Sequence, residues 1–313
     1  MDGLEVVVTG IKLSHPIMNA SGVLASTPEG VVRLIDAGVS AVVTKTLTKE
    51  PREGYKTPIT IPLPIGLLNA IGLANPGIEA VGKLVDTGHA LGKPVIVSIG
   101  GRDPDEFLYL AEKALDAGAD ALELNLSCPH TPGYGVDAAK TINTIKEVVK
   151  NVASISNKPV WAKLGYSRLL VKEAGAALEA GASALVLINT IPGMKIDVYA
   201  LKPILSHGYG GLSGPAIHPI AVYSIYTVYR EYKPEIIGAG GAADWESAIE
   251  LLAAGAKAVQ IATAFHLKGY NIIKEIINGI KQYLKQTKRV LRFMGVRWKN
   301  TITFSNYQHH RLQ

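Results

Sequence analysis

The chain has 313 residues, of which 48% are hydrophobic and 19% charged, with a formal net charge of +6. This length and apolar content predict a globular protein with a sizeable core, and the single cysteine excludes an internal disulfide and any iron–sulfur cluster held by this chain alone. No apolar run approaches the roughly 20 residues of a membrane helix, and the sequence shows no signal-peptide pattern and no nucleic-acid motif, so we expect a cytoplasmic protein.

The chain begins with an alternating stretch, LEVVVTGIKLSHP at residues 4–16, that predicts a short β-hairpin. Eight nearly continuous apolar runs then predict strands buried on both faces. These runs span residues 16–20, 39–46, 94–100, 121–127, 159–164, 184–190, 235–241 and 258–264. Helical patterns separate the runs, for example at residues 104–117, 137–153, 171–180, 244–254 and 269–285. Strands that alternate with helices indicate βαβ units with parallel pairing.

Four helix-to-strand junctions share one pattern, in which Ala-Gly precedes an apolar run. They read DAGVSAVV at 36–43, DAGADALEL at 116–124, EAGASALVL at 179–187 and AAGAKAVQI at 253–261. Glycine suits the residue just past a helix, where a left-handed conformation is needed. Eight such repeats predict a (β/α)8 TIM barrel whose bottom the N-terminal hairpin plugs. A doubly wound open sheet is the alternative, but NASGVL at 19–24 matches its glycine fingerprint poorly.

We expect one domain over residues 1–313, because no convincing linker interrupts the pattern. Much of the positive charge lies in residues 281–299. The basic C-terminal extension, residues 286–313, is interpreted as a solvated segment or as an element that docks a partner.

In a barrel of this kind the active site lies at the carboxyl ends of the strands. The residues that leave the predicted strands there are Asn19, Ala20, Ser21, Gly22, Lys45, Thr46, Ser98, Gly100, Gly101, Asn125, Ser127, Cys128, Lys163, Asn189, Thr190, Gly240, Gly241 and Thr263. Buried lysines need an anion, asparagines can bind a planar heterocycle through both donor and acceptor, and bare backbone after the last strands suits a phosphate. Together they predict a phosphate-bearing planar cofactor and a small, polar, planar substrate.

Each of these residues taken alone has a plainer interpretation. A lone cysteine is often an apolar filler of the core, a glycine after a strand is usually a turn, and a buried asparagine commonly bonds to backbone. His130 and His207 lack the spacing of metal ligands, so we expect no metal site. The joint placement at strand ends is what favours a functional site.

Seven motifs resemble the class 1 dihydroorotate dehydrogenases, FMN-dependent (β/α)8 barrels of pyrimidine biosynthesis. They are TKTLTKEPREGYKTP (44–58), LLNAIGLANPG (67–77), LELNLSCP (122–129), AKL (162–164), LINTIPGMKID (187–197), GGLSGPAIHP (210–219) and IIGAGGAADWESAIELLAAGA (236–256). The chain is most similar to the branch that works with a separate iron–sulfur/FAD subunit and NAD. The resemblance runs from about residue 4 to about residue 285, and it also implies a homodimer core.

The resemblance implies that Cys128 is the catalytic base that removes a proton from C5 of dihydroorotate. It implies substrate contacts from Lys45, Asn69, Ala70, Ile71, Gly72, Leu73, Asn125, Asn189 and Thr190. It implies FMN contacts from Ser21, Lys45, Thr46, Ser98, Asn125, Lys163, Ile188, Gly214, Gly240, Gly241, Ala262 and Thr263. Lys163 corresponds to the lysine beside the flavin N1/O2 region, and residues 129–137 correspond to a lid that excludes water.

Three residues depart from the family pattern. His130 stands where the family usually has asparagine, Ser98 replaces an asparagine on the flavin side, and Ala262 replaces a glycine. The sequence NLSCPH also occurs in the FMN domain of dihydropyrimidine dehydrogenases, which reduce uracil and thymine. The NAIGL segment at 69–73 is instead a dihydroorotate-type feature used for the substrate carboxylate, so dihydroorotate is the favoured substrate.

Two further questions stay open at this point. The chain could be an inactive barrel that serves as a binding module, although the intact Cys128, Lys45 and Lys163 argue against this interpretation. The electron acceptor could be a partner subunit, fumarate or another direct acceptor, because the chain has no NAD fingerprint of its own.

Overall fold

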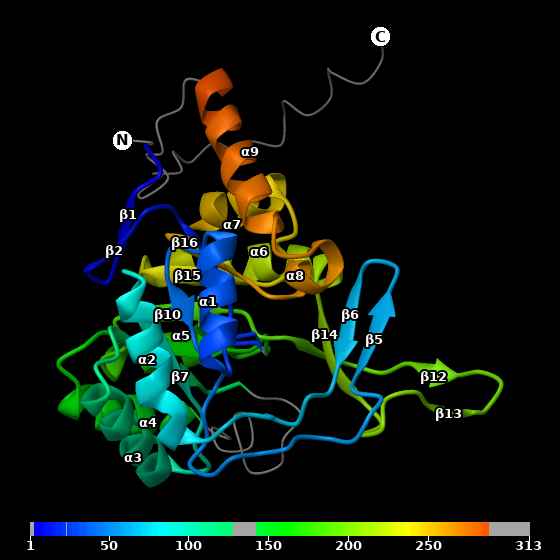
Figure 1. Cartoon of the computed structure of the whole chain (residues 1–313), viewed down its shortest axis with the longest axis horizontal. Coiled ribbons are helices and arrows are strands. Elements are labelled where there is room, and N and C mark those ends of the chain that lie inside the picture. The colour runs from blue at the N-terminus through cyan, green and yellow to red at the C-terminus, as the bar shows by residue number, and fades with distance from the viewer. Residues whose placement is uncertain (1–2, 23, 128–141, 288–313) are drawn as a thin grey trace.

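Eight parallel strands alternate with helices in the computed structural model, which describes residues 3–22, 24–127 and 142–287 (Figure 1). The strand order in the sheet is β3-β16-β15-β10-β9-β8-β7-β4. The strands are β3 (Ile17–Asn19), β4 (Val42–Val43), β7 (Val95–Ile99), β8 (Ala121–Asn125), β9 (Val160–Leu164), β10 (Ala184–Leu187), β15 (Ile236–Ala239) and β16 (Ala258–Ile261). Each strand falls within one of the eight predicted ranges, so the TIM-barrel prediction is confirmed.

Side-chain hydrogen bonds join β3 and β4, the two strands at the ends of this sheet order. The Asn19 amide is fully buried; its Nδ2 donates to the Val43 carbonyl over 2.6 Å, and its Oδ1 accepts from the Val43 N–H over 3.1 Å. Ser40 adds a backbone bond of 3.0 Å to the Ile17 carbonyl. One asparagine thus supplies the pair of bonds that a neighbouring strand would otherwise provide, and the sheet closes.

The helices that surround the strands are α1 (Pro28–Ala37), α2 (Val81–Ala90), α3 (Pro104–Asp116), α4 (Ile142–Ile155), α5 (Leu170–Glu179), α6 (His218–Tyr232), α7 (Trp245–Ala254), α8 (Thr263–Lys268) and α9 (Ile272–Thr287). Two 3-10 turns, η1 (Ile78–Ala80) and η2 (Pro215–Ile217), precede α2 and α6. None of these helices has the length and apolar character needed to cross a membrane within the ranges that the structure describes.

Three predicted helices have accurate boundaries, and the main error lies just after β16, where a short helix was predicted as strand. Helices α3, α5 and α7 match the predicted ranges to within one residue. The range 258–264 was predicted as strand throughout, but β16 ends at Ile261 and α8 begins at Thr263. The helix predicted over 269–285 is present as α9, and it begins three residues later than predicted because Gly269, with a φ of 77°, caps α8 and separates it from α9. The predicted residues 137–141 lie outside the described ranges.

The predicted N-terminal hairpin is present and forms the bottom of the barrel. It consists of β1 (Val6–Val8) and β2 (Ile11–Leu13), joined by a turn at Thr9 and Gly10 whose φ angles are 48° and 87°. Positive φ at both turn residues is the geometry that two-residue hairpins prefer. The hairpin packs into an apolar cluster with Met18 and Trp161, and the Trp161 Nε1 donates to the Thr9 hydroxyl over 2.9 Å.

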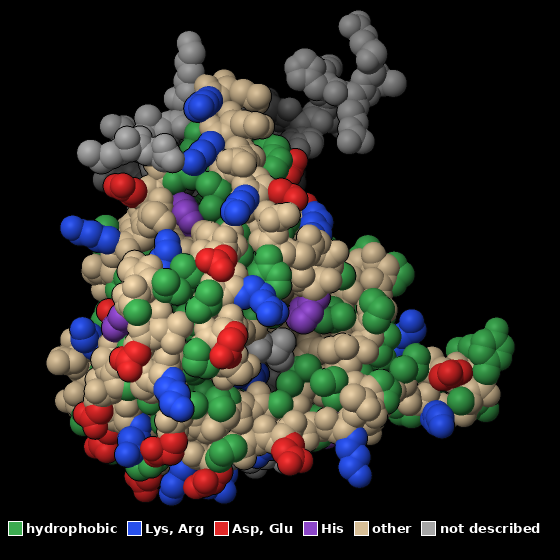
Figure 2. Space-filling view, viewed as in Figure 1, with side chains coloured by type: hydrophobic (Ala, Val, Ile, Leu, Met, Phe, Trp, Pro, Cys, Tyr) green, Lys and Arg blue, Asp and Glu red, His purple; other side chains and the backbone are tan. Residues whose placement is uncertain are grey.

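A second, antiparallel sheet interrupts the barrel pattern, and no regular alternation in the sequence predicted it. Its order is β11 (Ile191–Gly193), β14 (Gly210–Ser213), β6 (Gly66–Asn69) and β5 (Thr60–Leu63). A small hairpin of β12 (Ile196–Asp197) and β13 (Lys202–Pro203) extends away from the body (Figure 1). The tip of this hairpin is apolar and exposed in Figure 2, with Tyr199 96% exposed.

Candidate active site

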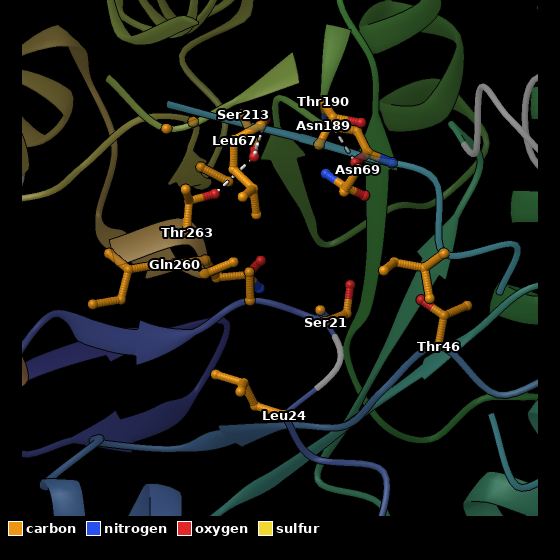
Figure 3. Close-up of a pocket in the computed structure, with 18 of the residues that line it drawn as sticks. Ser21, Leu24, Thr46, Leu67, Asn69, Asn189, Thr190, Ser213, Gln260 and Thr263 are labelled. Carbon is orange, nitrogen blue, oxygen red and sulfur yellow. Dashed lines mark hydrogen bonds between the residues drawn. The ribbon is translucent and has the colours of Figure 1, made fainter. Parts of the chain in front are cut away.

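A cavity of about 540 Å³ lies between the carboxyl ends of the barrel strands and the second sheet (Figure 3). Most of the predicted contact residues line it, although they come from segments far apart in the sequence. They are Ser21, Lys45, Thr46, Asn69, Ile71, Gly72, Leu73, Asn125, Lys163, Ile188, Asn189, Thr190, Gly214, Gly240, Gly241, Ala262 and Thr263. The second sheet therefore brings the 69–73 segment over the strand ends, which the sequence alone could not position.

Two predicted contact residues, Ala70 and Ser98, lie behind the wall of the cavity and not on it. Both are fully buried. The Ser98 hydroxyl lies 3.0 Å from the Thr46 hydroxyl and 3.3 Å from the Glu123 carboxylate, to which it donates. Ser98 therefore reaches the cavity through Thr46, which does line it.

Cys128 and His130 lie outside the described residues, as does the predicted lid at residues 129–137. The chain can be followed to Ser127, which is buried. The Asn189 amide donates to both the carbonyl and the hydroxyl of Ser127, each over 3.0 Å. The residue immediately before Cys128 is thus anchored to a side chain that lines the cavity.

The asparagines of the cavity are held in fixed orientations by neighbouring groups. The Asn125 Nδ2 donates to the Thr46 hydroxyl over 3.2 Å, and the Asn69 Nδ2 donates to the Gly211 carbonyl over 3.0 Å. The Asn189 Oδ1 accepts from the Thr190 N–H over 2.8 Å. These bonds restrict the rotation of each amide, an arrangement that could orient a ring with defined donors and acceptors.

A buried network of charged and polar side chains forms the floor of the cavity. The Lys163 ammonium lies 3.2 Å from the Glu123 carboxylate, and it donates to the Ser21 hydroxyl over 2.9 Å. The Gln260 Nε2 donates to the other carboxylate oxygen of Glu123 over 2.7 Å. Neither Glu123 nor Gln260 was among the predicted site residues. Each is a polar residue inside an apolar strand, and Glu123 shares a face with Asn125 two residues later, which was the available signal.

Bare glycine backbone forms the opposite rim of the cavity. Gly240 and Gly241 follow β15 with φ angles of 120° and 81°. A Cβ on Gly241 would lie 2.6 Å from the Cβ of His218 and 2.8 Å from the Gly214 carbonyl oxygen. The Thr263 hydroxyl, which donates to Ser213 over 2.8 Å, completes this rim (Figure 3). The rim thus presents main chain to a ligand because no side chain fits there.

Helix α7 begins next to the glycine rim with a well-formed cap. The Asp244 carboxylate accepts from the Ser247 N–H over 2.9 Å and from its hydroxyl over 2.6 Å. Partial burial raises the pKa of Asp244, but the hydrogen bonds from Ser247 outweigh this effect and leave the pKa lowered. The ionised cap fixes the segment that follows Gly241.

Comparison with known proteins gives a consistent result over nearly the whole length. A family model described as "Dihydroorotate dehydrogenase" matches residues 3–284. The chain is 47% identical over 285 residues to the dihydroorotate dehydrogenase B (NAD(+)) catalytic subunit of Pyrococcus horikoshii, covering 90% of this chain and 93% of the relative. It is 38% identical over 298 residues to the protein of the same description from Thermoplasma volcanium, covering 95% and 99%. A putative dihydroorotate dehydrogenase A (fumarate) from Aeropyrum pernix is 45% identical over 282 residues, covering 90% and 92%.

Proposed function

The chain belongs to the dihydroorotate dehydrogenase family, and on that premise we propose that it oxidises dihydroorotate to orotate in pyrimidine biosynthesis. One observation carries the proposal. A single cavity collects two buried lysines, three oriented asparagines and a glycine rim from separate parts of the chain. This combination suits a small anionic heterocycle together with a phosphate-bearing ring cofactor.

We propose that the cofactor is FMN, since dihydroorotate dehydrogenases are in general flavin-dependent. The glycine rim fits a phosphate, because backbone N–H groups can approach it closely where Cβ atoms are absent. Gly214, Gly240, Gly241, Ala262 and Thr263 would hold the phosphate, and Ser21, Thr46, Asn125, Lys163 and Ile188 would contact the rest of the cofactor. When bound, FMN supplies the acceptor for the hydride that leaves the substrate.

Lys45 favours dihydroorotate over uracil or thymine as the substrate. Lys45 is only 6% exposed and lines the cavity, and a buried ammonium is best compensated by an anionic group. Dihydroorotate is a small ring that carries a carboxylate, whereas the substrates of dihydropyrimidine dehydrogenases carry none. We assign the carboxylate to Lys45 and the 69–73 segment, and the ring edge to Asn125, Asn189 and Thr190.

We propose that Cys128 is the base. It directly follows the anchored Ser127 in the sequence, and Asn125, the last residue of β8, lines the cavity. A thiol has an ordinary pKa of about 8.5, so only modest tuning is needed for its thiolate to act as a base near neutral pH. The C5 proton would pass to the thiolate sulfur on one face of the ring, and the C5–H electron pair would form the new C5=C6 double bond as a hydride leaves C6 from the other face.

We propose that a separate subunit passes the electrons to NAD(+), as the description of several relatives as catalytic subunits of an NAD(+) enzyme suggests. This chain has one cysteine and so cannot hold a four-cysteine cluster by itself. Fumarate is the second candidate acceptor, because the relative from Aeropyrum pernix is described with it. A homodimer core and a cytoplasmic location stay predictions.

Anaerobic flavin spectroscopy tests the proposal. Purified protein loaded with FMN should be yellow, and dihydroorotate should bleach the oxidised-flavin absorbance without any other reductant. A protein that binds no FMN would contradict the proposal. Reactivity with uracil and NADPH but not with dihydroorotate would instead support the dihydropyrimidine alternative. A screen of fumarate, NAD(+) and NAD(+) with the candidate partner subunit would then identify the acceptor.

A further inference from the structure

The acidic residue beneath the cavity, Glu123, has no role in the mechanism above. Its side chain is fully buried on β8 and does not line the cavity. Its partner Lys163, on the neighbouring strand β9, is 5% exposed and does line it. The pair is therefore layered, with the cation at the cavity surface and the anion directly behind it.

Hydrogen bonds specify the charge and position of both groups. The three donors of Lys163 have three acceptors, namely Ser21 at 2.9 Å, Glu123 at 3.2 Å and Gln260 at 3.5 Å. Both carboxylate oxygens of Glu123 accept, one from Lys163 and Ser98 and the other from Gln260. The Gln260 amide fits only with its nitrogen toward Glu123 and its oxygen toward Lys163. Such a network suits an ionised carboxylate and a protonated amine.

The same carboxylate ends a directed chain of hydrogen bonds from the substrate side of the cavity. The Asn125 amide donates to the Thr46 hydroxyl, whose oxygen lies 3.0 Å from the Ser98 hydroxyl, which in turn donates to Glu123. Because Ser98 gives its proton to Glu123, Thr46 must donate to Ser98. Glu123 therefore orients groups on both sides of the cavity. It acts on Asn125 through the Thr46 and Ser98 hydroxyls, and it bonds to Lys163 directly.

Stability alone does not explain a buried ion pair at this place. Replacing such a pair with apolar residues of similar volume is often neutral or stabilising. Two residues earlier on the same inward face, β8 and β9 carry Ala121 and Trp161, which pack in an apolar cluster. The change from apolar to charged side chains occurs where the barrel interior meets the cavity. This position indicates that the ion pair sets the electrostatic potential at the bound ligand.

We propose that Glu123 is a positioning residue that holds Lys163 beneath the flavin and offsets its charge, and thereby lowers the flavin reduction potential. The inference rests on the proposed function, because it needs a flavin above Lys163. A reduced flavin carries more negative charge than an oxidised one, so a cation nearby favours reduction and an anion behind that cation opposes it. Neutralising Glu123 should therefore make the flavin easier to reduce.

The test is the midpoint potential of FMN bound to Glu123→Gln, which keeps the shape and removes the charge. At pH 6.5 we expect the equilibrium constant for flavin reduction to rise at least tenfold, about 30 mV for a two-electron couple. The matched control is Glu179→Gln, which removes the same charge from an exposed ion pair with Lys146 on the surface, and its equilibrium constant should be unchanged. An unchanged or lowered potential in Glu123→Gln would overturn the proposal.

Glu123→Asp keeps the test decisive if Glu123→Gln does not fold. The aspartate is one methylene shorter and draws the anion away from Lys163, so the equilibrium constant should rise about threefold. No rise in Glu123→Asp would also overturn the inference. The wild-type protein separates this failure from failure of the proposed function. If dihydroorotate does not bleach the wild-type flavin, the proposed function is wrong. If bleaching is normal but the flavin potential of the Glu123 variants is unchanged, only the role of Glu123 is rejected.

Discussion

The two ends of the barrel are built from the same strands but have opposite characters. At the bottom, the hairpin β1–β2 covers an apolar layer that includes Met18 and Trp161. At the top, Lys163 follows Trp161 by two residues and belongs to a layer of charges and amides. Since residues i and i+2 of a strand share a face, one step along the strand separates the two layers. Changes at the bottom should therefore affect stability, and changes at the top should affect chemistry.

The largest expected effect is at the top. Cys128→Ala should lower turnover with dihydroorotate by about 10²–10⁴-fold, the usual contribution of a positioned general base. FMN binding and the thermal midpoint should be unchanged, since the substitution removes only a sulfur. Steady-state kinetics and a flavin titration on the same preparation check both parts. Turnover equal to that of the wild type would refute the assignment of the base.

The strongest test at the bottom is Trp161→Ala. Trp161 is fully buried among apolar neighbours, and its indole N–H has a partner in Thr9. Truncation should lower the free energy of unfolding by about 3–5 kcal/mol through the lost burial and the cavity left behind. At a temperature where the variant is folded, its flavin potential should match that of the wild type. A shifted potential with little loss of stability would break the distinction between the two ends.

His15 gives the bottom a pH dependence. Its Nδ1 accepts from the Ile17 N–H and its Nε2 donates to the Gly38 carbonyl, so the fold favours the neutral form of the imidazole ring. Burial lowers the pKa of His15 to about 4, from an ordinary value of 6.5. The unfolded chain takes up a proton as the pH falls below 6.5, while the folded chain does so only near pH 4. The free energy of unfolding should therefore fall by about 3 kcal/mol over this window.

The matched variant for His15 is His15→Gln, which has no proton to exchange in this range. Urea unfolding at several pH values between 4 and 7 gives the free energy of unfolding as a function of pH. This free energy should change less steeply with pH in the variant than in the wild type. The difference between the two slopes isolates His15 from the other titrating groups. Parallel curves for the two proteins would show that the buried ring does not control stability here.

The bottom could be predicted from sequence more fully than the top. Alternation over residues 4–16 predicted the hairpin, and apolar runs predicted all eight strands, because burial on both faces leaves a pattern in adjacent residues. The second sheet left no such pattern. Its strand β14 is only Gly210–Ser213, and it pairs Gly211 with Asn69 across 142 positions of the chain.

Most of the cavity residues were predicted through the resemblance to a family, but two residues of the floor, Glu123 and Gln260, were not. Glu123 and Gln260 lie inside runs that look like core, and a motif gives no account of what lies beneath a ligand. The available signal was parity. Glu123 and Asn125 have the same parity on β8, so a residue that faces the cavity implies that the polar residue two positions earlier faces inward too.

The smallest of the expected effects concerns the glycine rim of the top. Gly241 has a φ of 81°, and a Cβ there would lie 2.8 Å from the Gly214 carbonyl oxygen, so Gly241→Ala must strain or shift the turn. The strain of such a position is on the order of 1–3 kcal/mol, and we expect FMN affinity to fall by about 5- to 150-fold. Gly82→Ala on α2, where nothing lies within 4 Å of the new Cβ, is the matched control and should bind FMN normally. Riboflavin, which lacks the phosphate, sharpens the assignment. Gly241→Ala should lower the affinity for FMN more than the affinity for riboflavin, because the rim is where the phosphate is proposed to bind. An equal loss of affinity for both ligands would place the phosphate elsewhere.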